Sequence, residues 1–350
     1  MLPKDTRIGF LAPISKSIPP DTYGPQERVI AGIIRGLVEL GYSDITLFAT
    51  AQTKITGVKT VALFDVPFSE RQPAEPRIEE WRHIAHALAA AQGQVDILHN
   101  HMNYLPLLLS PLNQVPTVTT LHGSGIESDA KFGYLANKDS PYISISDHER
   151  TFIPELNYVA TIFNPIDASL YTPVAPSEVE PYLVNTGRMD PQKGVHEAIA
   201  LAKKLGRPLR LAGPIAPHQQ VYFDEMIKPH VDGDRIQYLG NLGAAEVRRL
   251  IAGATAFIGL TEWEEPFGLA IAEALACGVP VIASDRGAHT ETVRKGISGI
   301  LVKDTAEAVR RFDEVLGLDR TRIRHDAEAR FGIPTIARQH AAAYARVLGL

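Results

Sequence analysis

The sequence contains very little cysteine and no long hydrophobic run. Its 350 residues include one cysteine, Cys277, so an internal disulfide and a cysteine-rich metal site are both excluded. The longest apolar stretch, residues 269–283, is interrupted by Glu273 and Pro280 and is shorter than the ~18–20 residues that span a bilayer. The first five residues include a proline and an acid, where a secretory signal needs a basic segment and an apolar core. We therefore expect a cytoplasmic protein without integral membrane association.

An excess of charge of one sign is also absent. The chain carries 35 lysines and arginines and 40 aspartates and glutamates, which gives a formal net charge of -5. This balance argues against a general nucleic-acid-binding surface. With 45% hydrophobic and 21% charged residues, the composition is that of an ordinary globular protein, and at roughly 100–200 residues per domain the length predicts about two domains.

Short strand-like runs alternate with helical patterns along the whole chain, which predicts an α/β protein with doubly wound parallel sheets covered by helices. In the first half, we expect strands at 7–11, 45–50, 95–99, 116–121 and 142–146, and helices at 26–40 and 77–91. In the second half, we expect strands at 182–186, 208–212, 236–239, 256–260, 279–283 and 299–302, and helices at 194–205, 222–228, 244–252, 268–277, 305–316 and 335–348.

A proline-containing stretch without periodicity interrupts this alternation at residues 169–181. We interpret it as a linker between two Rossmann-like domains. The N-terminal domain then covers residues 1–168, and the C-terminal domain covers residues 182–334.

The segment from Thr261 to Glu273 carries the strongest chemical signal. It follows an apolar strand, and Pro266 and Gly268 mark the start of a helix whose free N–H groups favour an anion. Glu265 precedes this helix and Glu273 lies about two turns into it, so the two carboxylates could bind different parts of one extended ligand. The alternative, that acids complement a helix dipole, covers Glu265 but not Glu273, which lies inside an apolar run.

A second constellation runs from Gly187 to Gly194 and includes Arg188 and Lys193. Ligands of open α/β sheets bind outside the carboxyl ends of the strands, where these two cations could neutralise a diphosphate. The spacing differs from that of a P-loop, so a Walker-type ATPase is excluded. Taken alone, the two cations could equally be solvated surface residues.

In the first half, His122 ends a strand-like run and is followed by Gly123. This position is compatible with a role in a binding cleft and with a purely structural histidine. The segment Gly24-Pro25-Gln26 follows the first strand and opens a helix. It is either another anion-binding position or simply a turn.

Two further patterns resemble metal sites. Asp232 and Asp234 have the spacing of a metal-binding aspartate pair, but they lie in a polar segment before a strand, which favours a turn. His99 and His101 are two residues apart on a strand and share one face, and no third ligand is nearby in sequence. We therefore predict no metal site. No Gly-x-Ser-x-Gly elbow is present either, so we also predict that the protein is not a serine-nucleophile hydrolase.

Taken together, these motifs resemble glycosyltransferase family 4, a group of retaining enzymes with the GT-B fold that use nucleotide-sugar donors. The likeness covers nearly the whole chain, and its most specific part is the pair Glu265 and Glu273 with seven residues between them. The matching blocks, in chain order, are Tyr23-Gly24 with Glu27-Arg28, Asp96 to His101, Leu121 to Gly123, Ser144 to Ser146, Asn164 to Asp167, Gly187-Arg188 with Lys193-Gly194, and Glu265 to Ser284.

The resemblance implies a role for each of these residues. Arg188 and Lys193 would hold the donor diphosphate, Glu265 the transferred sugar and Glu273 the ribose, while His122 would lie near the reacting centre. Further donor contacts are implied for Gly187, Phe267, Gly268 and Leu269. The loop Gly24-Pro25-Gln26 would bind phosphate or acceptor, and the helix at 335–350 would cross back to the N-terminal domain.

The implied reaction is transfer of a hexose from a nucleoside-diphosphate sugar to a hydroxyl of a small soluble acceptor, with retention and without a cofactor or required metal. UDP is the expected diphosphate, with GDP and ADP as alternatives, and retention by front-face attack or by double displacement stays open. Two other functions are compatible with the same fold: a nucleotide-sugar 2-epimerase and a non-catalytic nucleotide-sugar-binding subunit. The sequence gives no indication of oligomeric state.

Two loops depart from the family pattern. Gly24-Pro25-Gln26 stands where the family has two glycines and a small apolar residue, and the missing amide of Pro25 changes what that loop can bind. Residues 286–291 keep only Gly287 and Glu291 of the family's Gly-Gly-x-Pro-Glu loop. His289 in this loop either lines the donor-sugar pocket or has no function.

Overall fold

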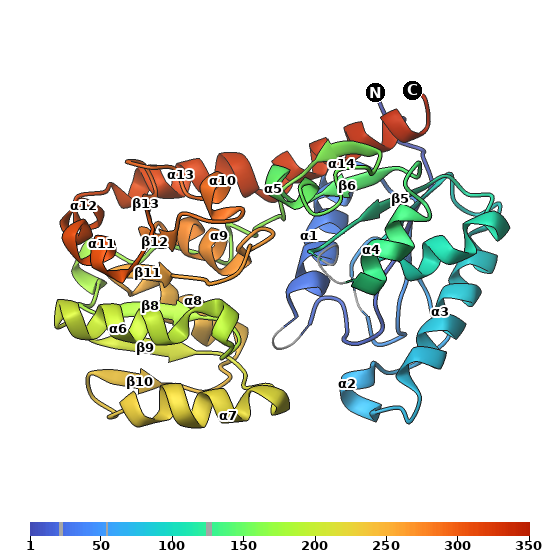
Figure 1. Ribbon diagram of the computed structural model, residues 1–350. Coiled ribbons are helices and arrows are strands. Elements are labelled where there is room, and N and C mark those ends of the chain that lie inside the picture. Colours follow the sequence, from blue (N-terminus) through green and yellow to red (C-terminus); the bar gives the residue numbers. More distant parts are fainter. Residues whose placement is uncertain (21–23, 54, 124–127) are drawn as a thin grey trace. The chain divides into compact units, whose positions relative to one another are not determined.

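The computed structural model describes residues 1–20, 24–53, 55–123 and 128–350 (Figure 1). It divides into two compact units, one of Met1–Pro165 with Ile333–Leu350 and one of Ile166–Gly332. Each unit is built on one parallel sheet, which confirms the predicted α/β architecture. Residues 169–181, which we expected to form a linker, lie in the second unit.

The first unit has a seven-stranded sheet in the order β3-β2-β1-β4-β5-β6-β7. Its strands are β1 (Ile8–Leu11), β2 (Ile45–Phe48), β3 (Lys59–Val61), β4 (Ile97–Asn100), β5 (Thr117–Thr120), β6 (Tyr142–Ser144) and β7 (Tyr158–Thr161). Its helices are α1 (Pro25–Glu39), α2 (Phe68–Arg71), α3 (Pro76–Ala91), a 3-10 helix at Leu105–Leu112, α4 (Ser128–Leu135), α5 (Asp147–Arg150) and α14 (Ile333–Val347). Helices α1 and α14 pack on one face of the sheet, and α3 packs on the other.

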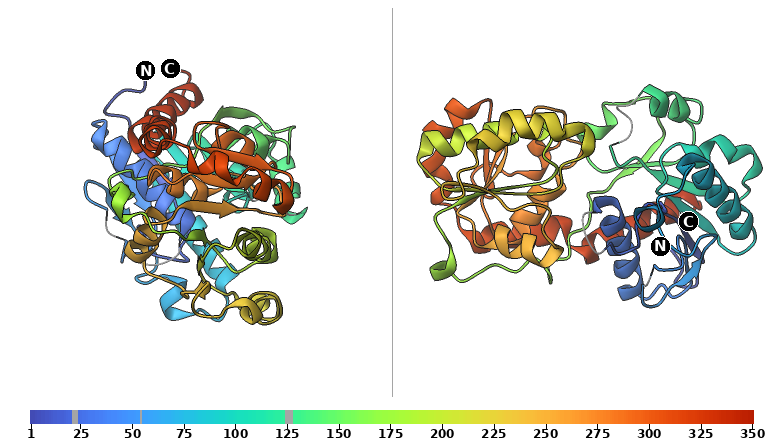
Figure 2. Two further views of the ribbon diagram at one scale, coloured as in Figure 1. Left: turned by 90° about the vertical axis from the view of Figure 1, so that its left-hand side faces the viewer. Right: turned by 90° about the horizontal axis from the view of Figure 1, so that it is seen from below.

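Helix α1 illustrates why the sequence folds in this way. Pro25 occupies the first helical turn, where its missing N–H costs nothing. Apolar residues at helical spacing form its buried face: Val29, Ile30, Ile33, Ile34 and Leu37. Gly36 lets α14 approach closely, because a Cβ there would lie 2.6 Å from Cβ of Ala337. The last helix thus completes the core of the first unit, and both chain ends lie close together there (Figure 2).

The second unit has a six-stranded sheet in the order β10-β9-β8-β11-β12-β13. Its strands are β8 (Leu183–Thr186), β9 (Leu209–Ala212), β10 (Ile236–Tyr238), β11 (Ala256–Gly259), β12 (Val281–Ser284) and β13 (Gly299–Val302). Its helices are α6 (Val195–Leu205), α7 (Gln220–Tyr222), α8 (Ala244–Ala252), α9 (Leu269–Ala276), α10 (His289–Thr292), α11 (Thr305–Arg310), α12 (Phe312–Leu316) and α13 (Arg320–Phe331). Side chains alternate between the two faces, so that Leu183 and Ile258 face the core under α6 and α11. Helices α8 and α13 both contact α9.

Several elements differ from the prediction. Strands β3 and β7 and helix α13 were not predicted, because each is short or too polar to show a clear apolar period. The helix expected at 305–316 is interrupted at Arg311, and the one expected at 222–228 is replaced by α7, a π-helical turn at Phe223–Ile227 and a 3-10 turn. Among the helices of the described residues, none combines the length and the apolar character needed to cross a bilayer.

Candidate functional site

The candidate site of the second unit lies where its strand order reverses. Strands β8 and β11 are neighbours in the sheet, and the chain continues from them in opposite directions, to β9 on one side and to β12 on the other. Ligands of open α/β sheets bind outside the carboxyl ends of strands at such a point. Gly187 and Arg188 follow β8 directly, and the segment that leads to Glu265 follows β11.

Two loops meet closely at this edge. Gly194 has a positive φ of 61°, and a Cβ there would lie 1.7 Å from the carbonyl oxygen of Leu260. Only glycine therefore fits at this position. The N–H of Glu262 donates to the carbonyl of Gln192 at 2.9 Å. The loop that carries Lys193 is thus attached to the loop that carries Glu265.

Lys193 and Glu265 form a direct ion pair. Lys193 Nζ lies 2.6 Å from Glu265 Oε2, and Nε1 of Trp263 donates to the same oxygen at 2.9 Å. Glu265 is 8% exposed, and Lys193 Nζ also lies 4.7 Å from the centroid of the Trp263 ring. Burial raises the pKa of Glu265, but the ammonium and the two hydrogen bonds outweigh this effect and hold the pKa below its ordinary value of 4.5. The site therefore contains a carboxylate that stays ionised although it is buried.

Arg188 supplies the second positive charge of this loop. Its Nη2 lies 3.8 Å from Oδ2 of Asp190, and its side chain is 40% exposed. Its Nε is buried without a hydrogen-bond partner in the described part of the chain. Asp190 is itself fixed, because its carboxylate accepts from the N–H of Gln192 at 2.9 Å. Arg188 thus has donor capacity that the described protein groups do not use.

The start of α9 completes the group of predicted donor residues. Gly268 caps the helix with φ of 84°, and its carbonyl accepts from the N–H groups of Ile271 and Ala272. Leu269 is the first residue of the helix, where N–H groups have no acceptor within the helix and favour an anion. The side chain of Phe267 is buried against Phe331. The contribution that Phe267 can make to a ligand is therefore that of its backbone.

Glu273 is buried on α9 and bonded to a residue that the sequence did not single out. Tyr171 Oη lies 2.6 Å from Glu273 Oε1, and both side chains are buried. The guanidinium of Arg324 donates to the carbonyls of Tyr171, Ala168 and Ala276 and holds this segment against α9. Tyr171 lies in the stretch expected to be a linker, and its one sequence signal is an aromatic residue among polar residues and prolines.

In the first unit, His122 lies at the corresponding edge of its own sheet. It follows β5 with φ of 53°, and its Nε2 lies 2.7 Å from Nδ1 of His101, which follows β4. Burial lowers the pKa of His101 and brings that of His122 to about 3, so both rings are uncharged at neutral pH. Nε2 of His101 is buried without a hydrogen-bond partner among the described residues.

Glu149, a residue not predicted from the sequence, fixes the backbone beside His122. Its carboxylate accepts from the N–H groups of Gly123 and Ile145, and the side chain is fully buried. Burial raises the pKa of Glu149 to about 7, against the effect of these two bonds. The sequence signal that pointed to Glu149 is the pattern Ser146-x-x-Glu149, which marks a helix start. In the structure, Ser146 Oγ accepts from the N–H of Glu149.

The predicted loop of the first unit ends in the start of α1. Gly24 caps the helix, and Pro25 is its first residue. The side-chain amide of Gln26 donates through Nε2 to the backbone carbonyl of His101. Tyr23, which belongs to the same motif, lies outside the described residues. The structure thus brings Gln26 to the backbone of the histidine that contacts His122. His122 and Gln26 belong to the first unit, whereas Arg188, Lys193, Glu265 and Glu273 belong to the second.

The patterns that resembled metal sites form hydrogen-bonded structures. Oδ1 of Asp232 accepts from the N–H groups of Asp234 and Ile236, both at 2.9 Å, as expected for a turn. His99 and His101 lie on one face, as predicted, with ring centroids 3.9 Å apart. His99 is bonded to Tyr344 of α14 and to Thr120, both at 2.7 Å.

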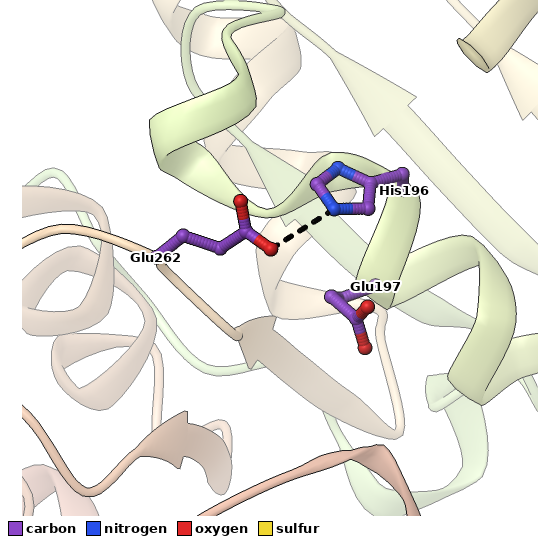
Figure 3. Close-up of side chains that lie close together, drawn as sticks. All are labelled: His196, Glu197 and Glu262. Carbon is purple, nitrogen blue, oxygen red and sulfur yellow. Dashed lines mark hydrogen bonds and ion pairs between the residues drawn. The ribbon is translucent and has the colours of Figure 1, made fainter.

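A different trio has potential metal-ligand atoms within 4.8 Å of one another: His196, Glu197 and Glu262 (Figure 3). Nε2 of His196 lies 3.2 Å from Glu262, and its Nδ1 lies 2.9 Å from the hydroxyl of Tyr222. Glu197 accepts from the hydroxyl of Thr305. Each member already has a protein partner, so the trio is explained by its hydrogen bonds.

Part of the chain matches a known protein family. Residues 173–330 match the model of the family described as glycosyl transferases group 1. The chain is 29% identical to glycogen synthase of Mycobacterium tuberculosis (strain ATCC 25618 / H37Rv) over 233 residues, which cover 59% of this chain and 56% of that protein. The chain thus spans little more than half the length of this relative.

Solved structures match nearly the whole chain. Sucrose-phosphate synthase from Thermosynechococcus elongatus has a TM-score of 0.79 at 19% identity, covering 98% of this chain and 99% of that one. The Anabaena protein HepE, crystallised with UDP and glucose, has a TM-score of 0.73 at 21% identity, covering 97% of this chain and 99% of that one. At these identities, the likeness concerns the fold.

Proposed function

We propose that the chain transfers a hexose from a nucleoside-diphosphate sugar to an acceptor hydroxyl, because residues 173–330 match the glycosyl transferases group 1 family and the chain has the GT-B fold. In this proposal the anomeric configuration is retained, UDP is the nucleoside diphosphate, the acceptor is small, and no metal is required. The two cations of residues 187–194 bind the diphosphate, and Glu265 and Glu273 bind the two sugars of the donor.

The observation that carries the proposal is the ion pair of partly buried Lys193 with buried Glu265 beside the start of α9. It lies at the point where the strand order of the sheet reverses and within the segment that matches the family. A buried ion pair contributes little to stability compared with well-packed apolar residues. Its presence at a ligand-binding edge therefore favours a functional role.

The chemistry of the proposed reaction requires positive charge at the leaving group. When the bond between the sugar and the diphosphate breaks, negative charge grows on the phosphate oxygens. Arg188, Lys193 and the first N–H groups of α9 then stabilise the transition state more than the ground state. This arrangement supplies without a metal the charge that a divalent cation provides elsewhere.

The two buried carboxylates suit hydroxyl groups. Ionised Glu265 accepts hydrogen bonds only, and it faces Lys193, so a sugar hydroxyl bound to it would lie next to the cation that holds the phosphate. Glu273 is oriented by Tyr171 at 2.6 Å and would accept from the ribose hydroxyls. In the first unit, uncharged His122 would offer a hydrogen bond to the sugar without adding charge, and residues 24–26 would contact acceptor or phosphate.

The choice of UDP is supported at the level of the fold, because HepE was crystallised with UDP and glucose. A small acceptor fits the helices of the described residues, because none of them is a long basic amphipathic helix of the type that holds proteins at a membrane surface.

Thermal unfolding with UDP, GDP and ADP, each with magnesium or with EDTA, tests the donor site. A ligand at 100 times its dissociation constant adds about 2.7 kcal/mol of stability. We expect a shift of the melting temperature with UDP that is equal in magnesium and in EDTA, and its loss in Arg188→Ala. The absence of a shift with all three diphosphates would refute the donor site, and a shift only with magnesium would refute metal independence.

Turnover then distinguishes the alternatives. Incubation with UDP-glucose and a panel of small hydroxyl acceptors, followed by NMR of the anomeric proton, should give an acceptor-dependent product with the α configuration of the donor. Conversion of the sugar nucleotide without acceptor would indicate an epimerase instead. Binding of the donor without any conversion would indicate a non-catalytic subunit.

A further inference from the structure

His289 is a buried histidine in the loop that departs from the family pattern. It is 1% exposed and begins the short helix α10, directly after the segment 285–288 that follows β12. The neighbouring residue Ala288 donates its N–H to the carbonyl of Glu265 at 2.8 Å. A Cβ at Gly287 would lie 2.6 Å from the backbone nitrogen of Glu265. The loop of His289 is therefore fixed against the backbone of a proposed donor-binding residue.

One ring nitrogen of His289 is held by the protein. Nδ1 lies 3.3 Å from Oγ of Ser284, which in turn lies 3.1 Å from Oγ1 of Thr261. This row of polar groups fixes the orientation of the imidazole. The opposite ring edge, which carries Nε2, therefore has a defined direction.

That edge faces the start of α9. A Cβ built on Gly268 would lie 3.3 Å from Nε2 of His289 and 3.7 Å from Cγ of Glu265. His289 and Glu265 thus both line the position of Gly268. The hydrogen bond that the described residues make to this ring is the one at Nδ1, so Nε2 is available to a ligand.

We propose that Nε2 of His289 forms a hydrogen bond with a hydroxyl of the transferred sugar and makes His289 a specificity-determining residue for the donor. The proposal rests on the donor site described under Proposed function. A hydroxyl fits either tautomer of the ring, because it both donates and accepts. Burial lowers the pKa of His289 to about 4, so the ring is uncharged at neutral pH. An uncharged ring is a better partner for a neutral hydroxyl than for an anionic phosphate.

The test compares ligands with and without the sugar. The reference ligand is whichever of UDP, GDP or ADP stabilises the wild-type protein, and the probes are its glucose, galactose and N-acetylglucosamine derivatives. Dissociation constants are measured by calorimetry for the wild-type protein, for His289→Leu, which replaces the ring with an apolar side chain of similar size, and for His289→Gln, which keeps a polar group near Nε2. Thr290→Ala is the matched control, because Thr290 is exposed on the same short helix.

We expect His289→Leu to weaken binding of at least one sugar nucleotide about 10-fold, the value of one hydrogen bond. Binding of the diphosphate alone should change less than twofold, His289→Gln should recover part of the loss, and Thr290→Ala should match the wild type. Equal losses for the sugar nucleotide and the diphosphate would overturn the proposal, since His289 would then act on the phosphate or on the start of α9. Unchanged binding in both His289 variants would also overturn it. A wild-type protein that binds none of the three diphosphates contradicts the proposed function itself.

Discussion

Replacement of Lys193 by methionine tests the central ion pair of the second unit. The substitution keeps the length of the side chain and removes its charge, so that buried Glu265 retains the hydrogen bond from Trp263 and loses its counter-ion. Breaking a buried pair by removing one partner costs about 3–5 kcal/mol. Because the Lys193 side chain is 23% exposed, we expect the lower end, about 3 kcal/mol at pH 7. In a folded unit of this size, that corresponds to a fall in melting temperature of roughly 6–12 °C.

The dependence on pH identifies the cause. In the wild type, the pKa of Glu265 lies below 4.5, so the pair stabilises the folded state above about pH 4.5, and this stabilisation is lost as the pH falls through the folded pKa. Without Lys193, burial leaves the pKa of Glu265 raised, and the folded state takes up a proton more easily than the unfolded chain. The difference in stability between wild type and variant should therefore be larger at pH 7 than at pH 4.

Urea unfolding at pH 7 and pH 4 measures this difference. The double variant Lys193→Met/Glu265→Gln should be more stable at pH 7 than Lys193→Met alone, because the uncompensated charge is gone. Lys204→Met, at an exposed position of α6, should change stability by less than about 0.5 kcal/mol. An equal loss of stability in Lys193→Met at both pH values, or a double variant no more stable than the single one, would show that the unpaired charge of Glu265 is not the cause.

Three further predictions concern the groups around the two sites. Tyr171→Phe removes the bond to Glu273 and should weaken binding of the nucleoside diphosphate about 10-fold in calorimetry; unchanged affinity would separate Glu273 from the ribose. His101→Phe removes the partner of His122 and should lower kcat with little effect on the affinity for the diphosphate; an equal loss of both would contradict this separation. Gly194→Ala meets a backbone carbonyl at a positive φ and should cost more than about 2 kcal/mol in urea unfolding; a neutral result would contradict the close approach of the two loops.

Much of the fold followed from the sequence, because its elements differ in local pattern. Helix α1 shows an apolar face at helical spacing after Pro25, and β12 shows a continuous apolar run, so both could be predicted from their own residues. The strands and helices that were missed, such as β3 and α13, have weak patterns of their own and exist because they pack on neighbours. Their stability comes from tertiary contacts, which a local pattern does not contain.

In the candidate site, too, some features could be predicted from the sequence and others depend on the tertiary structure. The sequence by itself determined which charged residues follow the carboxyl ends of β8 and β11, namely Arg188, Lys193 and Glu265, and that Glu273 lies in the helix after them. Their positions were compatible with an anion-binding site, since parallel strands bring their carboxyl ends to one edge, and the resemblance to glycosyltransferase family 4 implied their roles toward a donor. Only the tertiary structure decided which groups contact which. Tyr171 reaches Glu273 across 102 positions of the chain, and Lys193 reaches Glu265 across 72, and contacts over such separations depend on how the chain folds back on itself.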